Sequence, residues 1–392
     1  MKASIALSVS ALAAGALAAP RNFTTIQPTG YFDPAAATAV QTTYPKYHHT
    51  VKGRLVDHMW HIVLDSADFD DAAANEDLQA LAKEGILLTN YYALTHPAQP
   101  NYLGMVGGDT FGLTNDSFVA LPKNISTLAE CFEDQRVMWA QYTEDQPFTA
   151  YDGWEYRTPG TPDDSPAQYS RAKNPFVAFD SVMSSVKRFV NLKSLKSFYN
   201  EQESGHIAQW LMIRPNTIND GSNSNLSTAA KWARDFLEPY ISSKKEYHRK
   251  LFVLTFAHAA TEDAPNRVYT LLLGDIPKKH RGTTDSMYYD HYSIASTTVA
   301  NYDLPTLGRH DCRSNVFALV NKKCHFHNTN RTIDPSDNYN SQRNTGWLSS
   351  TEVPLPIPNL NCKGAGRKYV PTKVKKTWRK ASYSYYQWVV NY

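Results

Sequence analysis

Three short and almost wholly apolar runs constrain the fold of this chain more than any other feature. They occupy residues 60–64, 210–213 and 251–256, and each suits one buried strand better than a helix of ordinary length. Stretches with apolar residues at helical spacing lie between them, at 75–84 and 227–241. This alternation predicts an α/β fold with a central, mostly parallel sheet flanked by helices.

Length and charge set the class of protein. With 392 residues, of which 42% are hydrophobic, the chain can bury the core of one large α/β unit. The 40 basic and 37 acidic residues leave a net charge of only +3, so we expect no nucleic-acid partner.

The N-terminus predicts export. Residues 1–18 combine a basic start, an apolar middle and a small-residue end, as a secretory signal peptide does, so we expect a secreted, extracellular protein. No later stretch reaches the roughly 20 apolar residues of a membrane span. We expect a lead segment over 19–54, an α/β domain over 55–330 with irregular loop insertions, and a basic, aromatic extension over 331–392.

In an exported protein, cysteines can form disulfides and sequons can be glycosylated. An even number of cysteines in an oxidising compartment predicts one or two disulfides, and Cys312 with Cys324, which closes a short loop, is the expected pair among three possible pairings. The four cysteines are Cys131, Cys312, Cys324 and Cys362. Asparagines in sequons are expected glycosylation sites on surface loops, and they are Asn22, Asn115, Asn124, Asn225 and Asn330.

One loop carries the strongest functional signal. Residues 95–102 read Thr-His-Pro-Ala-Gln-Pro-Asn-Tyr. This loop resembles the nucleophile loop of the fungal secreted acid phosphatases, which form a phosphoesterase family within the alkaline-phosphatase-like superfamily. Further matching segments lie at 87–92, 215–221, 282–285, 290–293 and 307–311. The resemblance implies an alkaline-phosphatase-like fold and a site for phosphate monoesters.

The resemblance also implies that the reactive positions have changed. The family places a phosphorylated serine where this chain has Ala98, and a methyl group cannot attack phosphorus. Thr95 or Ser66 could supply a relocated nucleophile, and His96 or His258 could serve as its general base. The other altered family positions are Ser66, Ser222, Asn223 and Ala257.

Metal binding is left open. Asp65, Asp220, His258 and His291 stand near the expected strand ends, and together they suggest at most a degenerate site for zinc or calcium. Alternatively, the histidines are partly buried and hydrogen-bonded, and the aspartates belong to turns. We therefore expect no cofactor, with a divalent metal as the alternative.

Phosphate binding is a separate question. The phosphate-binding candidates are Asn101, Arg171, Lys173 and Tyr292, of which Lys173 replaces a histidine of the family pattern. The amides at the start of the helix after Ala98 would favour an anion. A phosphate or phosphoester is thus the expected ligand.

These observations lead to three hypotheses. The favoured one is a secreted acid phosphatase-like glycoprotein with little or no phosphomonoesterase activity, a pseudoenzyme that binds phosphate or another anion in the old cleft. The second is an active phosphate monoester hydrolase with a rearranged metal site. The third is an extracellular structural or interaction protein whose cleft is vestigial.

Overall fold

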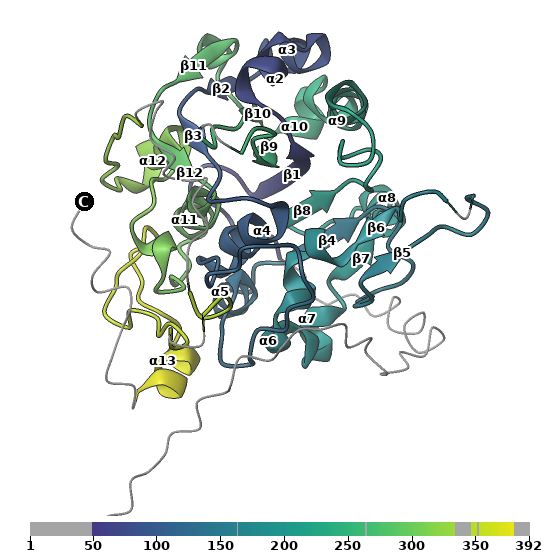
Figure 1. The fold of residues 1–392 in the computed structure, drawn as a ribbon. Coiled ribbons are helices and arrows are strands. Elements are labelled where there is room, and N and C mark those ends of the chain that lie inside the picture. Colours follow the sequence, from purple (N-terminus) through teal and green to yellow (C-terminus); the bar gives the residue numbers. More distant parts are fainter. Residues whose placement is uncertain (1–48, 163, 263–264, 334–345, 351–352, 380–392) are drawn as a thin grey trace, which may run out of the picture.

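An eight-stranded sheet forms the centre of the protein (Figure 1). The structure is a computed structural model, and it describes residues 49–162, 164–262, 265–333, 346–350 and 353–379. The strand order is β11-β2-β10-β9-β1-β8-β4-β7. The predicted signal peptide, most of the lead segment, Asn22 and the last 13 residues lie outside the described residues.

The sheet is mostly parallel, as the sequence predicted. The neighbours β9, β1, β8, β4 and β7 all run in one direction, whereas β10 runs antiparallel to both β9 and β2. At the edge, β11 pairs in parallel with β2. The bounds are β1 His58–Ser66, β2 Ile86–Leu88, β4 Trp139–Thr143, β7 Leu192–Ser194, β8 Trp210–Arg214, β9 Lys250–His258, β10 Thr270–Gly274 and β11 Thr283–Asp285.

The three apolar runs become the three central strands β1, β8 and β9. They lie side by side in the order β9-β1-β8, so their carboxyl ends meet at one edge of the sheet. The helical stretches are confirmed as α3 (Glu76–Ala82) and α9 (Leu226–Ile241). Asn75 and Asn225 cap these two helices, since their side chains accept backbone N–H groups of the first turn.

Tryptophans show how the sheet is buried on both faces. Trp60 packs edge-on against Phe198 and Tyr240, which come from α8 (Leu195–Glu203) and α9. On the opposite face, the Trp210 indole contacts Phe132 of α5 (Leu128–Gln135) and donates a hydrogen bond to Thr298 of α11 (Tyr292–Asn301) at 3.0 Å. Layers of helices therefore cover both faces, which explains the continuous apolar runs.

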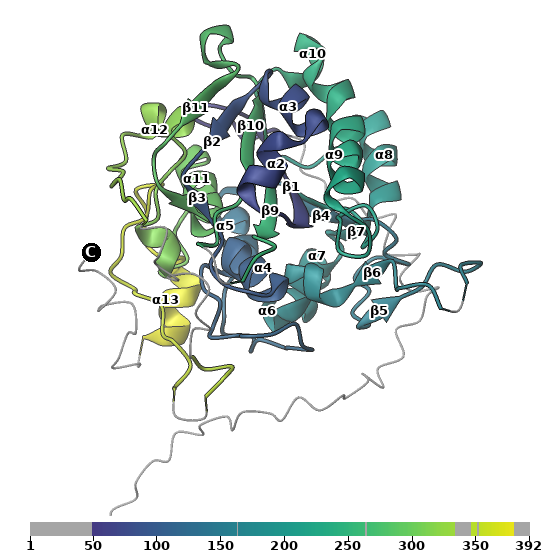
Figure 2. The same ribbon diagram turned by 45° about the horizontal axis from the view of Figure 1, so that its top comes forward.

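Figure 2 shows the remaining elements around the central sheet. The α-helices not yet given are α2 Phe69–Ala74, α4 Ala98–Gly107, α6 Asp180–Met183, α7 Val186–Phe189, α10 Lys244–Tyr247, α12 Ala318–Cys324 and α13 Thr372–Trp378. Two small sheets pair β3 Tyr91–Tyr92 with β12 Tyr289–Asp290, and β5 Glu155–Tyr156 with β6 Tyr169–Ser170. Among the described residues, no helix combines the length and the apolar character that crossing a membrane demands.

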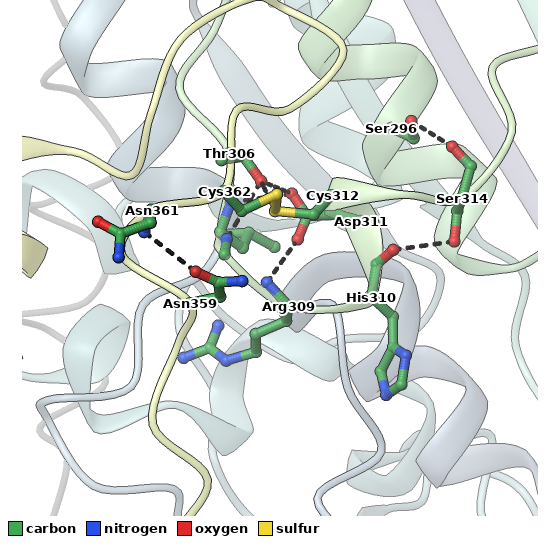
Figure 3. The surroundings of a disulfide bond; sticks show 12 residues. Ser296, Thr306, Arg309, His310, Asp311, Cys312, Ser314, Asn359, Asn361 and Cys362 are labelled. Atoms are coloured by element: carbon green, nitrogen blue, oxygen red, sulfur yellow. Dashed lines mark hydrogen bonds between the residues drawn. A yellow bond between two sulfur atoms is a disulfide. The ribbon is translucent and has the colours of Figure 1, made fainter. Parts of the chain in front are cut away.

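The expected disulfide is wrong in its pairing. Cys312 bonds to Cys362, 50 positions further along the chain, with 6.3 Å between Cα atoms (Figure 3). Cys131 and Cys324 are free and buried. The segment before Cys362 crosses back over Gly308, where the Asn359 amide donates to the Gly308 carbonyl at 2.7 Å. This crossing brings Cys362 to Cys312, a long-range contact that loop length does not reveal.

Candidate functional site

Ala98 is the first residue of α4 and lies near the carboxyl-terminal edge of the central strands. The preceding Pro97 is extended and provides no side-chain cap, and Ala98 is buried. The helix packs against β9 and α11. A buried methyl group thus begins this helix at the position that the resemblance assigns to the nucleophile, and a methyl group cannot attack phosphorus.

Asn101 fixes the shape of this loop. Its side-chain oxygen accepts the amides of Leu94 and Thr95 at 2.7 and 3.2 Å, and its amide group donates to the carbonyls of Thr95 and Pro97 at 2.7 and 2.8 Å. These four bonds use the hydrogen-bonding capacity of a primary amide. The structure thus gives Asn101 a role in holding the loop, which explains its presence without a ligand.

Thr95 and His96 are also held by the loop. Thr95 is completely buried, and its hydroxyl donates to the His96 carbonyl at 3.3 Å. The His96 ring contacts the His258 ring with 4.9 Å between centroids, and its Nε2 bonds to the Ala259 carbonyl at 3.0 Å. Burial, and secondarily His258, lowers the pKa of His96, so its neutral form is favoured.

Asp116 occupies the start of α4. Its Oδ1 accepts the backbone N–H of Gln99 at 2.8 Å, and the Gln99 side chain in turn accepts the amide of Ser117 at 2.7 Å. The first helical amides are the groups that a bound anion would use. A carboxylate of the chain itself therefore lies where the sequence predicted a free anion-binding amide.

A cluster of four charged side chains lies where β1 and β8 end. The Lys173 Nζ lies 2.8 Å from Asp65 Oδ1 and 2.9 Å from Asp220 Oδ2. Arg214 Nη2 lies 2.9 Å from the same Asp220 oxygen. Two positive and two negative charges thus neutralise one another within one buried cluster.

Asp65 is the penultimate residue of β1, and its side chain belongs to this cluster. Its backbone N–H donates to the Asp220 carbonyl at 2.9 Å, which ties the two acidic segments together. Burial alone would raise the pKa of the Asp65 carboxyl group, but Lys173, His258 and Arg214 outweigh it, and the pKa lies below its ordinary value. Asp65 is therefore ionised and paired.

Asp220 has no oxygen lone pair to spare. Oδ2 receives Lys173 and Arg214, while Oδ1 accepts both the N–H and the hydroxyl of Ser222 at 2.9 and 2.7 Å. Four donors match the four lone-pair positions of a carboxylate. Ser222, at an altered family position, thus acts as a hydrogen-bond donor to Asp220, while the neighbouring Asn223 is exposed.

The two predicted histidine ligands have different surroundings. His291 is fully buried, with Nδ1 3.0 Å from the Tyr91 hydroxyl and Nε2 2.9 Å from the Ala257 carbonyl. Both ring nitrogens are engaged, and burial lowers the pKa of His291 to about 3. His258, whose Cα is in register with that of Ser66, bonds through Nδ1 to the Ala259 carbonyl at 2.7 Å.

Arg171 and Tyr292, two other predicted phosphate ligands, make contacts within the protein. Arg171 is buried and donates to the backbone carbonyls of Asp152, Val119 and Val177 at 3.0, 3.0 and 2.8 Å. Tyr292 stacks on His310 with 4.6 Å between ring centroids. Of the four phosphate candidates, only Lys173 joins the charged cluster.

Sequence reasoning missed Arg214 and Asp116. Arg214 follows the apolar run of β8 directly, is fully buried, and places its guanidinium 4.6 Å from the centre of the Tyr102 ring. A charged residue immediately after a buried strand was the available signal. Asp116 lies within a polar stretch beside a predicted glycosylation site, and nothing in that stretch indicates its contact with α4.

The oxygen and nitrogen donors of this site are already engaged within the protein. Among the described residues, no group of three or more histidine, cysteine, aspartate or glutamate side chains is arranged to hold a metal ion. The carboxylates of Asp65 and Asp220 are bound to Lys173, and Asp220 is saturated with donors. These residues do not fit a divalent cation.

Comparison with known proteins identifies the family. The Phosphoesterase family pattern matches residues 44–305. The phosphate-repressible acid phosphatase of Penicillium chrysogenum is 40% identical over 342 residues, covering 86% of this chain and 80% of that protein. The acid phosphatase of Aspergillus niger is 36% identical over 360 residues, covering 89% and 84%.

Solved structures show a more distant likeness. A protein of the alkaline phosphatase superfamily from Vibrio parahaemolyticus is 12% identical, with a TM-score of 0.42, and the match covers 68% of this chain and 73% of that one. The sequence comparisons are far stronger, and the family pattern spans the loop at Ala98 together with all three central strands. The chain therefore belongs to the Phosphoesterase family and is acid phosphatase-like.

Proposed function

We propose that this protein is a secreted acid phosphatase-like glycoprotein that has lost phosphomonoesterase activity. One observation carries the proposal: Ala98, at the start of α4, has no group that can form a bond to phosphorus. Relatives of this chain are named acid phosphatases, so the fold is that of an enzyme while the position for covalent catalysis is inert.

The candidates for a replacement nucleophile support the same proposal. Thr95 is fully buried and its hydroxyl is hydrogen-bonded to the loop backbone, so it is not presented to a substrate. Phosphoryl transfer also depends on charge stabilisation of the transferred group. Here Lys173 and Arg214 already neutralise two carboxylates, so they have little net charge left for a phosphoester.

The deciding experiment is an acid-pH assay with p-nitrophenyl phosphate on secreted, purified protein, with metal analysis of the same sample. We expect no turnover above that of Ala98→Gly, which serves as a matched control without a side chain. Ala98→Ser should restore little, since the surrounding charges are unchanged and such groups act as a unit. Robust wild-type turnover or a covalent phosphoryl adduct would refute the proposal.

Turnover that depends on a bound metal would favour a second function. That function is a hydrolase with a rearranged site built from Asp65, Asp220, His258 and His291. The closeness of Asp65 and Asp220 favours it, whereas their pairing with Lys173 opposes it. Recovery of the protein from the culture medium, shortened by its N-terminal segment, tests the secretion part of the proposal.

A further inference from the structure

Asp65 at the end of β1 and Asp220 in the turn after β8 already hold a cation that belongs to the chain. Lys173 Nζ lies within 2.9 Å of both carboxylates, and the lysine side chain is only 11% exposed. A pair of carboxylates from neighbouring strand ends is the kind of oxygen donor that divalent cations prefer. Here an ammonium group lies between them.

We propose that Lys173 is a permanent internal cation that takes the place of a divalent metal ion between Asp65 and Asp220. The site is thereby closed to metals, and its charge balance does not depend on the metal supply. This inference rests on the proposed function for its biological meaning. It explains how the charged cluster around Asp65 and Asp220 is kept stable without a metal.

The chain on either side of Lys173 is built to present it. Before it, Arg171 is fixed by three hydrogen bonds to backbone carbonyls. After it, the buried Asn174 donates to Gln146 Oε1 and to the Tyr169 hydroxyl, both at 3.1 Å. Lys173 thus lies between two anchored residues, which fix the position from which its side chain reaches the two carboxylates.

The charge balance explains why a metal would be excluded. Asp65 and Asp220 contribute two negative charges, and Lys173 and Arg214 contribute two positive charges. A divalent cation entering this neutral cluster would face the ammonium and guanidinium groups at close range in a region of low dielectric constant. It would also have to displace donors from an oxygen of Asp220 that already accepts two.

The test compares metal binding by the wild type and by Lys173→Met, which keeps a flexible side chain but removes the charge. Lys193→Met is the matched control, because Lys193 has the same 11% exposure and pairs with Glu201 at 2.6 Å outside this cluster. Each chelator-treated protein is titrated calorimetrically with zinc, calcium or manganese alone, and its melting temperature is measured with and without each ion.

We expect wild type and Lys193→Met to bind no ion and to keep their melting temperatures when ions are added. Lys173→Met should melt below wild type, bind at least one of the ions at concentrations about tenfold or more below the highest at which wild type shows no binding, and regain melting temperature when that ion is present. Lys173→Arg, which keeps the charge, should remain insensitive to metal.

Two results would overturn the proposal: stoichiometric metal in the wild-type protein, or a Lys173→Met protein that responds to no ion. If Lys173→Met does not fold, Lys173→Gln, which retains a hydrogen-bond donor, takes its place under the same criteria. The proposed function and this inference are refuted by different results. If metal-free wild type hydrolyses phosphate esters, the proposed function is refuted but this inference still stands.

Discussion

Arg214 and Asp220 form an ion pair in which neither side chain exposes any surface, with 2.9 Å between Nη2 and Oδ2. The guanidinium also donates to the Val63 carbonyl, so it joins the end of β8 to the neighbouring β1. Because this pair is completely buried, each charge depends on the other for its solvation.

Replacement of Arg214 by methionine is therefore expected to lower the free energy of unfolding strongly. Removing one partner of a buried pair typically costs about 3–5 kcal/mol, since the other charge is left uncompensated. Urea denaturation checks this loss. The double variant Arg214→Met/Asp220→Asn should recover part of it, and a double variant no more stable than the additive sum of the single variants would contradict the coupling.

The disulfide provides a second prediction. Cys312 and Cys362 are separated by 50 positions in the sequence, and a loop of this size contributes about 4 kcal/mol in the chain-entropy account. Cys312→Ser and Cys362→Ser should each lower the free energy of unfolding by a similar amount. Cys324→Ser should have a much smaller effect, because Cys324 is free. Peptide mapping that links Cys312 to Cys324 would contradict the pairing.

The central strands, and the edge of the sheet where their carboxyl ends meet, could be predicted from the sequence because buried parallel strands require continuous apolar runs. The runs at β1, β8 and β9 are of this kind, and in open α/β folds their carboxyl ends mark the ligand site. This pattern drew attention to Asp65 at the end of β1 and to Asp220 in the turn after β8, and the structure brings both to Lys173.

The bonding within the site was not predictable in the same way. Lys173 lies far from Asp65 in the sequence, and no local pattern indicates that its ammonium group reaches between two strand ends. The same holds for Asp116 at the start of α4 and for Cys362 beside Cys312. Each is a tertiary contact set by how loops cross, and loop crossings leave no periodic signal in the sequence.

Buried histidines predict how stability changes with pH. Burial lowers the pKa of His61 to about 4 and that of His291 to about 3, from an ordinary value of 6.5. Between each lowered pKa and the ordinary value of 6.5, these histidines bind more protons in the unfolded chain than in the folded one. The free energy of unfolding therefore falls as the pH falls below 6.5. Asp290 acts in the opposite sense, because burial raises its pKa to about 6 and its protonation favours the folded state at acid pH.

The contribution of His291 can be isolated with His291→Gln, whose amide can still accept from Tyr91 and donate to Ala257. Between pH 4.5 and 6 the variant should lose about 1.4 kcal/mol per pH unit less than wild type, the value for one proton. Urea denaturation across this range measures the slopes. Equal slopes for wild type and His291→Gln would refute the neutral state of His291.

Asp116 predicts how the start of α4 responds to anions. Its carboxylate accepts the Gln99 amide at 2.8 Å, and a negative charge at a helix N-terminus is stabilising. Asp116→Ala should therefore lower the free energy of unfolding by about 1 kcal/mol. It should also make the protein more responsive to inorganic phosphate, because the anion no longer competes with a tethered carboxylate at high effective concentration.

Calorimetric titration of both proteins with phosphate measures this competition. We expect Asp116→Ala to bind phosphate more tightly than wild type, and Asp116→Asn to lie between them because the amide oxygen can still accept from Gln99. Wild-type binding as tight as that of Asp116→Ala would show that phosphate uses groups other than the Gln99 amide. In that case, anion binding would have survived the loss of the nucleophile, and Asp116 would be a capping residue alone.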